Sequence, residues 1–264
     1  MGSMLDANHC ANCGRTIDVP AQKFCPDCGQ PTPAHRIDWH FLGHELEHSV
    51  LHMDRGILYT LKNLMLRPGH LIRDYLEGRR ANHVKPLLLI MMLAAVVVLA
   101  TKMLLNAGVM DGALAAGMAA ALDQGPLDAR TLAIKQTTAS WMNHHFAVYT
   151  VLLLPLEALM FKWAFRRFRH LNYPEWLVIS AFLTAQTFVI WGLSIPFQRG
   201  FQYATSLALL VAVVWNIFSL VQLFNGYPRW KSALRALLAF VLFGLVSGVL
   251  TDLAAAAYVA VTQG

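Results

Sequence analysis

The chain has 264 residues, of which 56% are hydrophobic and only 14% charged, and its mean hydropathy is +0.47. These values lie outside the range of ordinary soluble domains and predict a membrane protein. The formal net charge of +6 and the pI of about 9.3 would also suit nucleic-acid binding, but the basic residues flank apolar runs, which is typical of membrane topology.

The first motif is a pair of Cys-x-x-Cys sequences, each followed by glycine. Their four cysteines are the only ones in the chain: Cys10, Cys13, Cys25 and Cys28. Two such knuckles supply four thiolates in tetrahedral geometry, which structural zinc prefers. Residues 8–31 are therefore predicted to be a zinc ribbon that holds one structural Zn²⁺. The phrase from Lys23 to Gln30 resembles the short bacterial zinc-ribbon family.

Two disulfides in a secreted domain are the alternative use of these cysteines. This alternative is weaker because the cysteines of one knuckle pair poorly, and because the predicted topology keeps them in the reducing cytoplasm. The ribbon is also a weak candidate for nucleic acid, since its basic residues Arg15 and Lys23 are balanced by Asp18 and Asp27. A cytoplasmic protein partner is the more typical use of such a module.

After a short proline-containing linker, Asp38 is predicted to cap a helix that runs to about Met53. Its apolar residues share one face and its histidines follow the other, which favours an amphipathic helix on the inner membrane surface. A second interpretation rests on His44-Glu45-x-x-His48. Two imidazoles one turn apart can bind a second metal ion, with Glu45 as the catalytic base of a hydrolase. No third ligand stands at a known spacing.

Residues 54–85 are too polar to span a membrane and too apolar to be free in water. Pro68-Gly69 breaks the helical pattern, and Gly78 and then Lys85-Pro86 end the next segments. This pattern predicts an interfacial elbow that feeds the first span. Five basic residues are expected at the lipid headgroups, where each adds on the order of 1 kcal/mol of attraction: Arg67, Arg73, Arg79, Arg80 and Lys85.

Residues 9–90 resemble a bacterial family of uncharacterised membrane proteins that join a zinc ribbon to a polytopic domain. The resemblance rests on the ribbon and on a series of short motifs: His44-Glu45-x-x-His48, Asp54-x-Gly56, Tyr59-Thr60-Leu61, Arg67-Pro68-Gly69, Tyr75-x-x-Gly78-x-Arg80 and Pro86. It implies that the histidine motif and the elbow belong together. It implies no activity.

Five apolar runs are long enough to cross about 30 Å of hydrocarbon. They are Pro86–Leu105, Phe146–Phe165, Trp176–Pro196, Tyr203–Phe224 and Leu234–Tyr258. The predicted fold is therefore mostly α: a five-helix transmembrane domain over residues 86–264, preceded by a linker and interfacial amphipathic helices over residues 32–85 and by the ribbon. An oligomer is compatible with this architecture.

Glu157 is the acidic residue nearest mid-membrane, two residues after Pro155. A carboxylate there is costly unless it is neutral or partnered, which makes it a candidate functional residue. The alternative is a structural role, in which a protonated Glu157 bonds a backbone carbonyl freed by Pro155. Gln186, Asn216 and Gln222 are its candidate neutral partners. Farther out, His144-His145 at the entrance to the second span is a candidate metal or proton site, although paired histidines at a boundary are more often solvated.

The basic residues fix the orientation. Of the 21 Lys and Arg, 17 fall before the first span or in residues 162–169 and 229–235, on one side of the predicted membrane. The other four are Lys102, Arg130, Lys135 and Arg199. By the positive-inside rule, the N-terminus is cytoplasmic and the C-terminus outside, in the inner membrane of a bacterium.

Two functions fit this sequence. The first is a non-catalytic protein that binds, moves or senses a lipid-like ligand or a membrane partner, with the ribbon as a docking module. The second is a metal-dependent hydrolase at the cytoplasmic interface, with His44 and His48 as ligands. We favour the first, because catalysis needs a third ligand and an open coordination position.

The predicted orientation can be tested by labelling single cysteines from the outer face. A probe at Gly264 should react and one at Ala34 should not, because five spans place the two ends on opposite sides. Labelling of both sites from one side would mean that a span has been miscounted within residues 106–145.

Overall fold

The computed structural model describes residues 8–17, 22–48, 56–109, 111, 129–168, 170–201 and 203–263. Within these residues the chain is mostly helical and contains no strand beyond two isolated bridges, His9–Thr16 and Phe24–Pro31. The helices are α1 (Trp39–His48), α2 (Ile57–Leu66), α3 (Pro68–Leu76), α4 (Pro86–Leu105), α6 (Ala129–His144), α7 (Phe146–Ala164), α8 (Tyr173–Ser194), the 3₁₀ turn η1 (Ile195–Phe197), α9 (Ala204–Leu223) and α10 (Arg229–Gln263).

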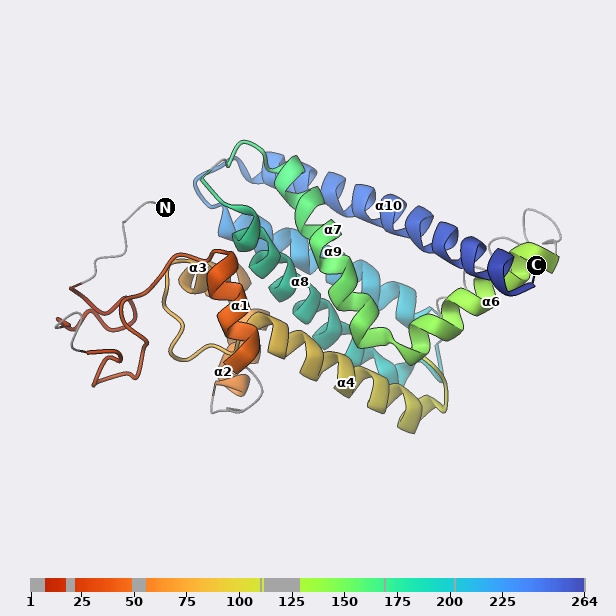
Figure 1. Cartoon of the computed structure of the whole chain (residues 1–264), viewed down its shortest axis with the longest axis horizontal. Helices are drawn as coiled ribbons and strands as arrows, with labels where there is room; N and C mark the ends of the chain where they lie inside the picture. Colours follow the sequence, from red (N-terminus) through yellow and green to blue (C-terminus); the bar gives the residue numbers. More distant parts are fainter. Residues whose placement is uncertain are drawn as a thin grey trace.

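Five helices are long and apolar enough to cross a membrane: α4, α7, α8 with η1, α9 and α10. They coincide with the five predicted spans to within a few residues at each end, which confirms the helical bundle. The short helices α1, α2 and α3 gather at one end of it, and the ribbon lies beyond them, as Figure 1 shows.

The central element of the bundle is α8, the most buried of the five spans. It packs against α4, α7 and α9. Its sequence is apolar around the whole circumference, as expected of a helix surrounded by others. Asn172 starts it with a capping box, in which its side chain accepts from the backbone of Glu175 while the Glu175 carboxylate accepts from the backbone of Asn172.

The break between α2 and α3 follows from Pro68. A helix that continued through this point would use the N–H of residue 68 to bond the carbonyl of Leu64, but proline has no N–H. Gln186 of α8 donates to that carbonyl instead, at 3.1 Å. The same Gln186 side chain accepts from the hydroxyl of Ser219 on α9, at 2.9 Å. The end of α2 is thereby joined to the centre of the bundle.

The start of α3 lies directly on the end of α9. The backbone N–H of Gly69 donates to the Gln222 side chain at 2.8 Å. Arg73, one turn further along α3, donates to the carbonyls of Gln222 and Leu223, which end α9. Cations near a helix C-terminus satisfy its last carbonyls and complement its dipole. The predicted elbow is therefore packed against the bundle through Gly69 and Arg73.

Two other predicted helix boundaries are also confirmed. Asp38 caps the start of α1, since its carboxylate accepts from the N–H of Phe41 at 2.8 Å. The predicted end of this helix near Met53 lies outside the described residues. Beyond α3, Gly78 takes a φ of +90°, a left-handed conformation that suits glycine at a helix end. The loop that follows is tied to α2, because the hydroxyl of Thr60 accepts from the N–H of Val84 at 3.0 Å.

Contact between α3 and α9 predicts that Gly69→Ala destabilises the protein. An added Cβ would lie 2.4 Å from the Leu223 nitrogen and 2.7 Å from the Gln222 Cβ, so the helices must separate. Overpacking of this kind typically costs about 1–3 kcal/mol. We expect a lower thermal midpoint in detergent. Gly226→Ala is the matched control, because a Cβ there meets no atom within 4 Å; equal midpoints for the two variants would contradict the prediction.

Candidate metal centre and its junction with the bundle

The four cysteines converge in the ribbon. Their sulfur atoms all lie within 4.8 Å of one another, with the Sγ atoms of Cys10 and Cys28 3.6 Å apart and those of Cys13 and Cys25 3.5 Å apart. A tetrahedral zinc with bonds of about 2.3 Å places its sulfur ligands roughly 3.8 Å apart, so the cluster fits the ion. All four cysteines are free, and these separations exceed the length of a disulfide bond.

Each knuckle is shaped by its glycine. The N–H of Gly14 donates to the Cys10 carbonyl at 2.8 Å, and the N–H of Gly29 donates to the Cys25 carbonyl at 2.9 Å. Both glycines have positive φ, +79° and +71°. A residue with a Cβ is strained in that conformation, which explains why glycine follows each Cys-x-x-Cys.

The pKa values of the cysteine thiols favour the binding of a cation among them. Burial raises the pKa of the Cys25 thiol, but the backbone amides of Cys28 and Asp27 outweigh it and bring the pKa to about 7. At Cys13 the amide of Arg15 lowers the pKa, whereas burial and the neighbouring sulfurs raise it to about 12. One thiolate thus opposes the formation of the next. A metal ion at the centre removes this repulsion and allows all four to ionise.

Gln30, directly after the second knuckle, joins the ribbon to the bundle. Its side chain is buried, and its carbonyl oxygen accepts from the backbone N–H of Arg80 at 3.0 Å. The Arg80 side chain is also held inside the protein: it donates to the Tyr75 carbonyl at 2.9 Å, and its guanidinium lies 4.3 Å from the centre of the Phe41 ring. The metal-binding loop is therefore fixed to the loop between α3 and α4.

The linker after the ribbon makes a second junction. Arg36 forms a bidentate ion pair with Glu175 at the start of α8, at 2.8 and 3.0 Å, and also donates to the carbonyl of His170. The next residue, Ile37, is fully buried, and its carbonyl accepts from the Asn172 side chain at 2.7 Å. The linker is thereby fastened to the loop between α7 and α8.

Sequence reasoning did not identify Gln30, Arg36 or Glu175 as functional residues. The spacing Asn-x-x-Glu before an apolar run is a recognisable capping-box signal for the start of α8. The partnership with Arg36 has no such signal, since 139 residues separate it from Glu175.

For the histidine motif, the structure describes only the backbone. Helix α1 includes positions 44 to 48, so His44 and His48 are one turn apart, as predicted. The side chains of His44, Glu45 and His48 lie outside the described residues. Among the residues that the structure does describe, the four cysteines are the one group of three or more side chains brought together as metal ligands.

Several of the basic residues predicted at the headgroups make contacts within the protein. Arg73 caps α9, Arg80 lies over Phe41, and Arg79 pairs with Asp74 at 2.7 Å and also with Glu77. Arg67, between α2 and α3, is exposed, and Lys85 precedes α4. Lipid contact by this set stays a prediction.

Near them, His83 packs between two tyrosines, 5.5 Å from the ring of Tyr59 and 6.5 Å from that of Tyr75. Burial lowers the pKa of this histidine, and the negative charge of Asp74 opposes the shift only in part. Burial thus favours the neutral form of His83, which packs in the loop between α3 and α4.

Glu157 is buried in α7, as expected. Its carboxylate accepts from the hydroxyl of Thr184 on α8 at 3.0 Å. The three amides proposed as partners bond elsewhere: Gln186 to Leu64 and Ser219, Asn216 to Thr187, and Gln222 to Gly69. A hydroxyl on the neighbouring helix therefore replaces them as the contact of Glu157.

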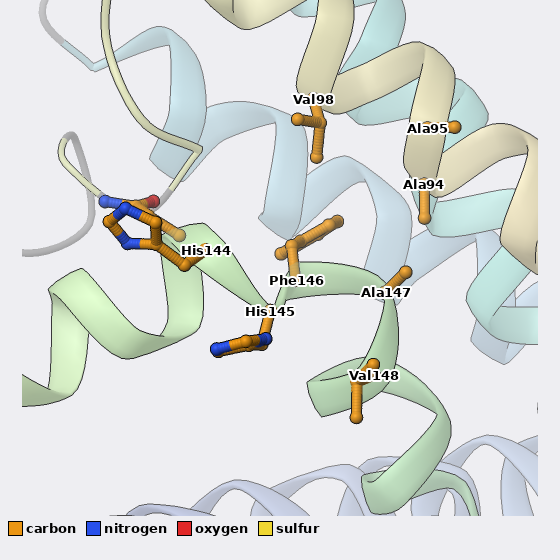
Figure 2. Close-up of a pocket in the computed structure, with 9 residues that line it drawn as sticks. Ala94, Ala95, Val98, His144, His145, Phe146, Ala147 and Val148 are labelled. Atoms are coloured by element: carbon orange, nitrogen blue, oxygen red, sulfur yellow. The ribbon is translucent and has the colours of Figure 1, made fainter.

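A cavity of about 270 Å³ lies at the bend between α6 and α7. Figure 2 shows this bend, which carries His144, His145 and Phe146, beside Ala94 and Val98 of α4. His144 Nδ1 is 2.7 Å from the carbonyl oxygen of Ser140, and His145 packs on Trp141 with ring centres 5.2 Å apart. Both imidazoles thus have ordinary local contacts.

Residues 54–98 match a family described as "Protein of unknown function (DUF3667)". The matched stretch covers α2, α3, the loop after them and α4 as far as Val98. No curated protein and no solved structure matches the chain. The match agrees with the resemblance found in the elbow motifs and indicates no activity.

The ribbon predicts that Cys28→Ser loses the bound metal and exposes residues 9–30 to proteolysis, while the five helices remain inserted. Metal binding supplies the folding energy of a module too small to bury a core of its own. Because protons compete for the thiolates, wild-type metal content should fall as the pH is lowered. Metal analysis and limited proteolysis measure both effects. Ala11→Ser, inside the first knuckle but not a ligand, is the control and should keep the metal.

Proposed function

We propose that this chain is a non-catalytic membrane protein that binds an anionic, lipid-like ligand at the end of the bundle where its ribbon is docked. In this proposal the ribbon holds one structural zinc, the docked end faces the cytoplasm of a bacterial cell, and the ribbon also offers a surface to a cytoplasmic protein partner. The parts of the chain would act together, because the ribbon and linker are fastened to the loops before α4 and α8.

The non-catalytic role is supported chiefly by the metal centre, where protein ligands fill every coordination position. Four cysteine sulfurs surround one point, so a bound zinc has its tetrahedral positions filled by protein. Catalytic zinc sites keep a position open for water or substrate, whereas structural sites do not. Metal at this centre therefore supports the fold.

The exposed face of α2 favours a lipid-like ligand. Leu58 and Leu66 are exposed, as are Lys62 and Arg67. Large apolar side chains beside cations are typical of a helix at the boundary between hydrocarbon and anionic headgroups. The opposite face, with Thr60 and Leu64, is buried against the bundle. This face also lies within the family match.

Lipid retention tests the proposal. Purified protein presented with equal amounts of phosphatidylglycerol and phosphatidylcholine should keep more of the anionic lipid in native mass spectrometry. Arg67→Gln should reduce that preference, since each interfacial cation contributes about 1 kcal/mol. Arg199→Gln, an exposed cation in the loop after η1, is the control and should have no effect.

Equal retention of the two lipids would contradict the proposed ligand. Metal analysis tests the other half of the proposal: one zinc per chain, retained in His44→Gln, supports a purely structural role. A second metal that disappears in His44→Gln would instead support a hydrolase.

A further inference from the structure

Two arginines from separate elements converge on Tyr227, in the loop between α9 and α10. The guanidinium carbon of Arg167, in the turn after α7, lies 5.6 Å from the centre of the tyrosine ring. That of Arg235, on α10, lies 5.1 Å from it. The two positive charges are thus no farther apart than the sum of these distances.

A stack of aromatic rings fixes the position of Tyr227. Phe168 stacks on Phe224 with ring centres 4.2 Å apart, and Phe224 stacks on the buried Phe165 at 5.0 Å. Tyr227 then meets Phe168 edge-on at 5.6 Å. The ring that receives both arginines is therefore anchored in the bundle and holds them in a defined place.

The two guanidinium groups lack a carboxylate partner within the described part of the chain. The ion pairs found there join Arg15, Arg36 and Arg79 to acidic residues, and neither Arg167 nor Arg235 takes part in one. The Nη1 atom of Arg235 is buried and has no hydrogen-bond acceptor. One turn earlier on α10, the hydroxyl of Ser232 is fully buried and also without a described partner.

Neighbouring cations are arranged differently. Arg166 lies over Trp163 and Lys231 over Trp230, so each has a ring of its own, and both tryptophans are exposed. Single cation–tryptophan pairs at a membrane boundary are ordinary interfacial anchors. Two arginines beside one ring repel each other, and an anion that contacts both would relieve that repulsion.

We infer that Arg167, Arg235 and Tyr227, with Ser232 one turn before Arg235, form a binding site for a phosphate-bearing anion. Arginine suits this ligand because its planar donors match phosphate oxygens. The inference rests on the proposed function and deepens it, because it places a headgroup site away from α2, on the loops that follow α7 and α9 at the same end of the bundle (Figure 1). A lipid phosphodiester and free inorganic phosphate share this chemistry.

The test measures binding to full-length protein in detergent by calorimetry, with three probes: a short-chain phosphatidylglycerol, the matching phosphatidylcholine and inorganic phosphate. Arg167→Gln and Arg235→Gln should each weaken binding of the anionic lipid about fivefold, and the double variant more than either. Arg166→Gln is the matched control. It removes the same charge from the adjacent position, but Arg166 lies over Trp163 and not over Tyr227, so binding should change less than twofold. Because Arg167 is exposed, its substitution still tests the site if the Arg235 variant does not fold.

The outcomes distinguish the anion site at Tyr227 from lipid binding at α2. Loss of phosphatidylglycerol binding in Arg167→Gln but not in Arg166→Gln supports the site, and the same loss with inorganic phosphate alone would identify the free ion as its ligand. Equal effects in Arg166→Gln and Arg167→Gln would overturn the site and leave lipid binding at α2 standing. No preference of the wild type for either anionic probe over phosphatidylcholine would overturn both.

Discussion

The structure depends on the backbone groups that the α2–α3 break leaves without helical partners. Pro68 has no N–H to bond the carbonyl of Leu64, so this buried acceptor needs a donor from another helix. Gln186 supplies the donor from α8, while Gln222 accepts from Gly69 and Arg73 closes the end of α9. These bonds hold α2 and α3 on the bundle, and α3 in turn positions the loop on which the ribbon is docked.

The features predicted from the sequence are those with local signals. Spans follow from apolar length, metal ligands from the Cys-x-x-Cys spacing, and the break in the elbow from Pro68. The junctions could not be predicted in this way. Gln30 and Arg80 are 50 residues apart and share no pattern, so only the folded chain shows that they touch.

The arginines show a second limit of prediction from sequence. A cation beside an apolar run indicates a membrane boundary, but it does not tell whether the side chain faces lipid or a neighbouring helix. Arg73 closes the end of α9 and Arg80 lies on Phe41, although both follow the pattern of headgroup ligands. The partner of Glu157 is equally ambiguous in the sequence. The orientation of α8 about its axis places Thr184, and not Gln186, beside Glu157.

The long separation between Gly69 and Gln222 has a consequence for biosynthesis. The two residues lie 153 positions apart, so α3 emerges from the ribosome well before its partner on α9 exists. At about 5–20 residues per second, that interval is roughly 8–30 seconds. Until α8 and then α9 are made, the polar groups of the elbow lack their partners on these helices, while the ribbon already has all its ligands. Metal loading can therefore precede membrane assembly, and the N-terminal third of the protein reaches its final contacts only after the fourth span has been inserted.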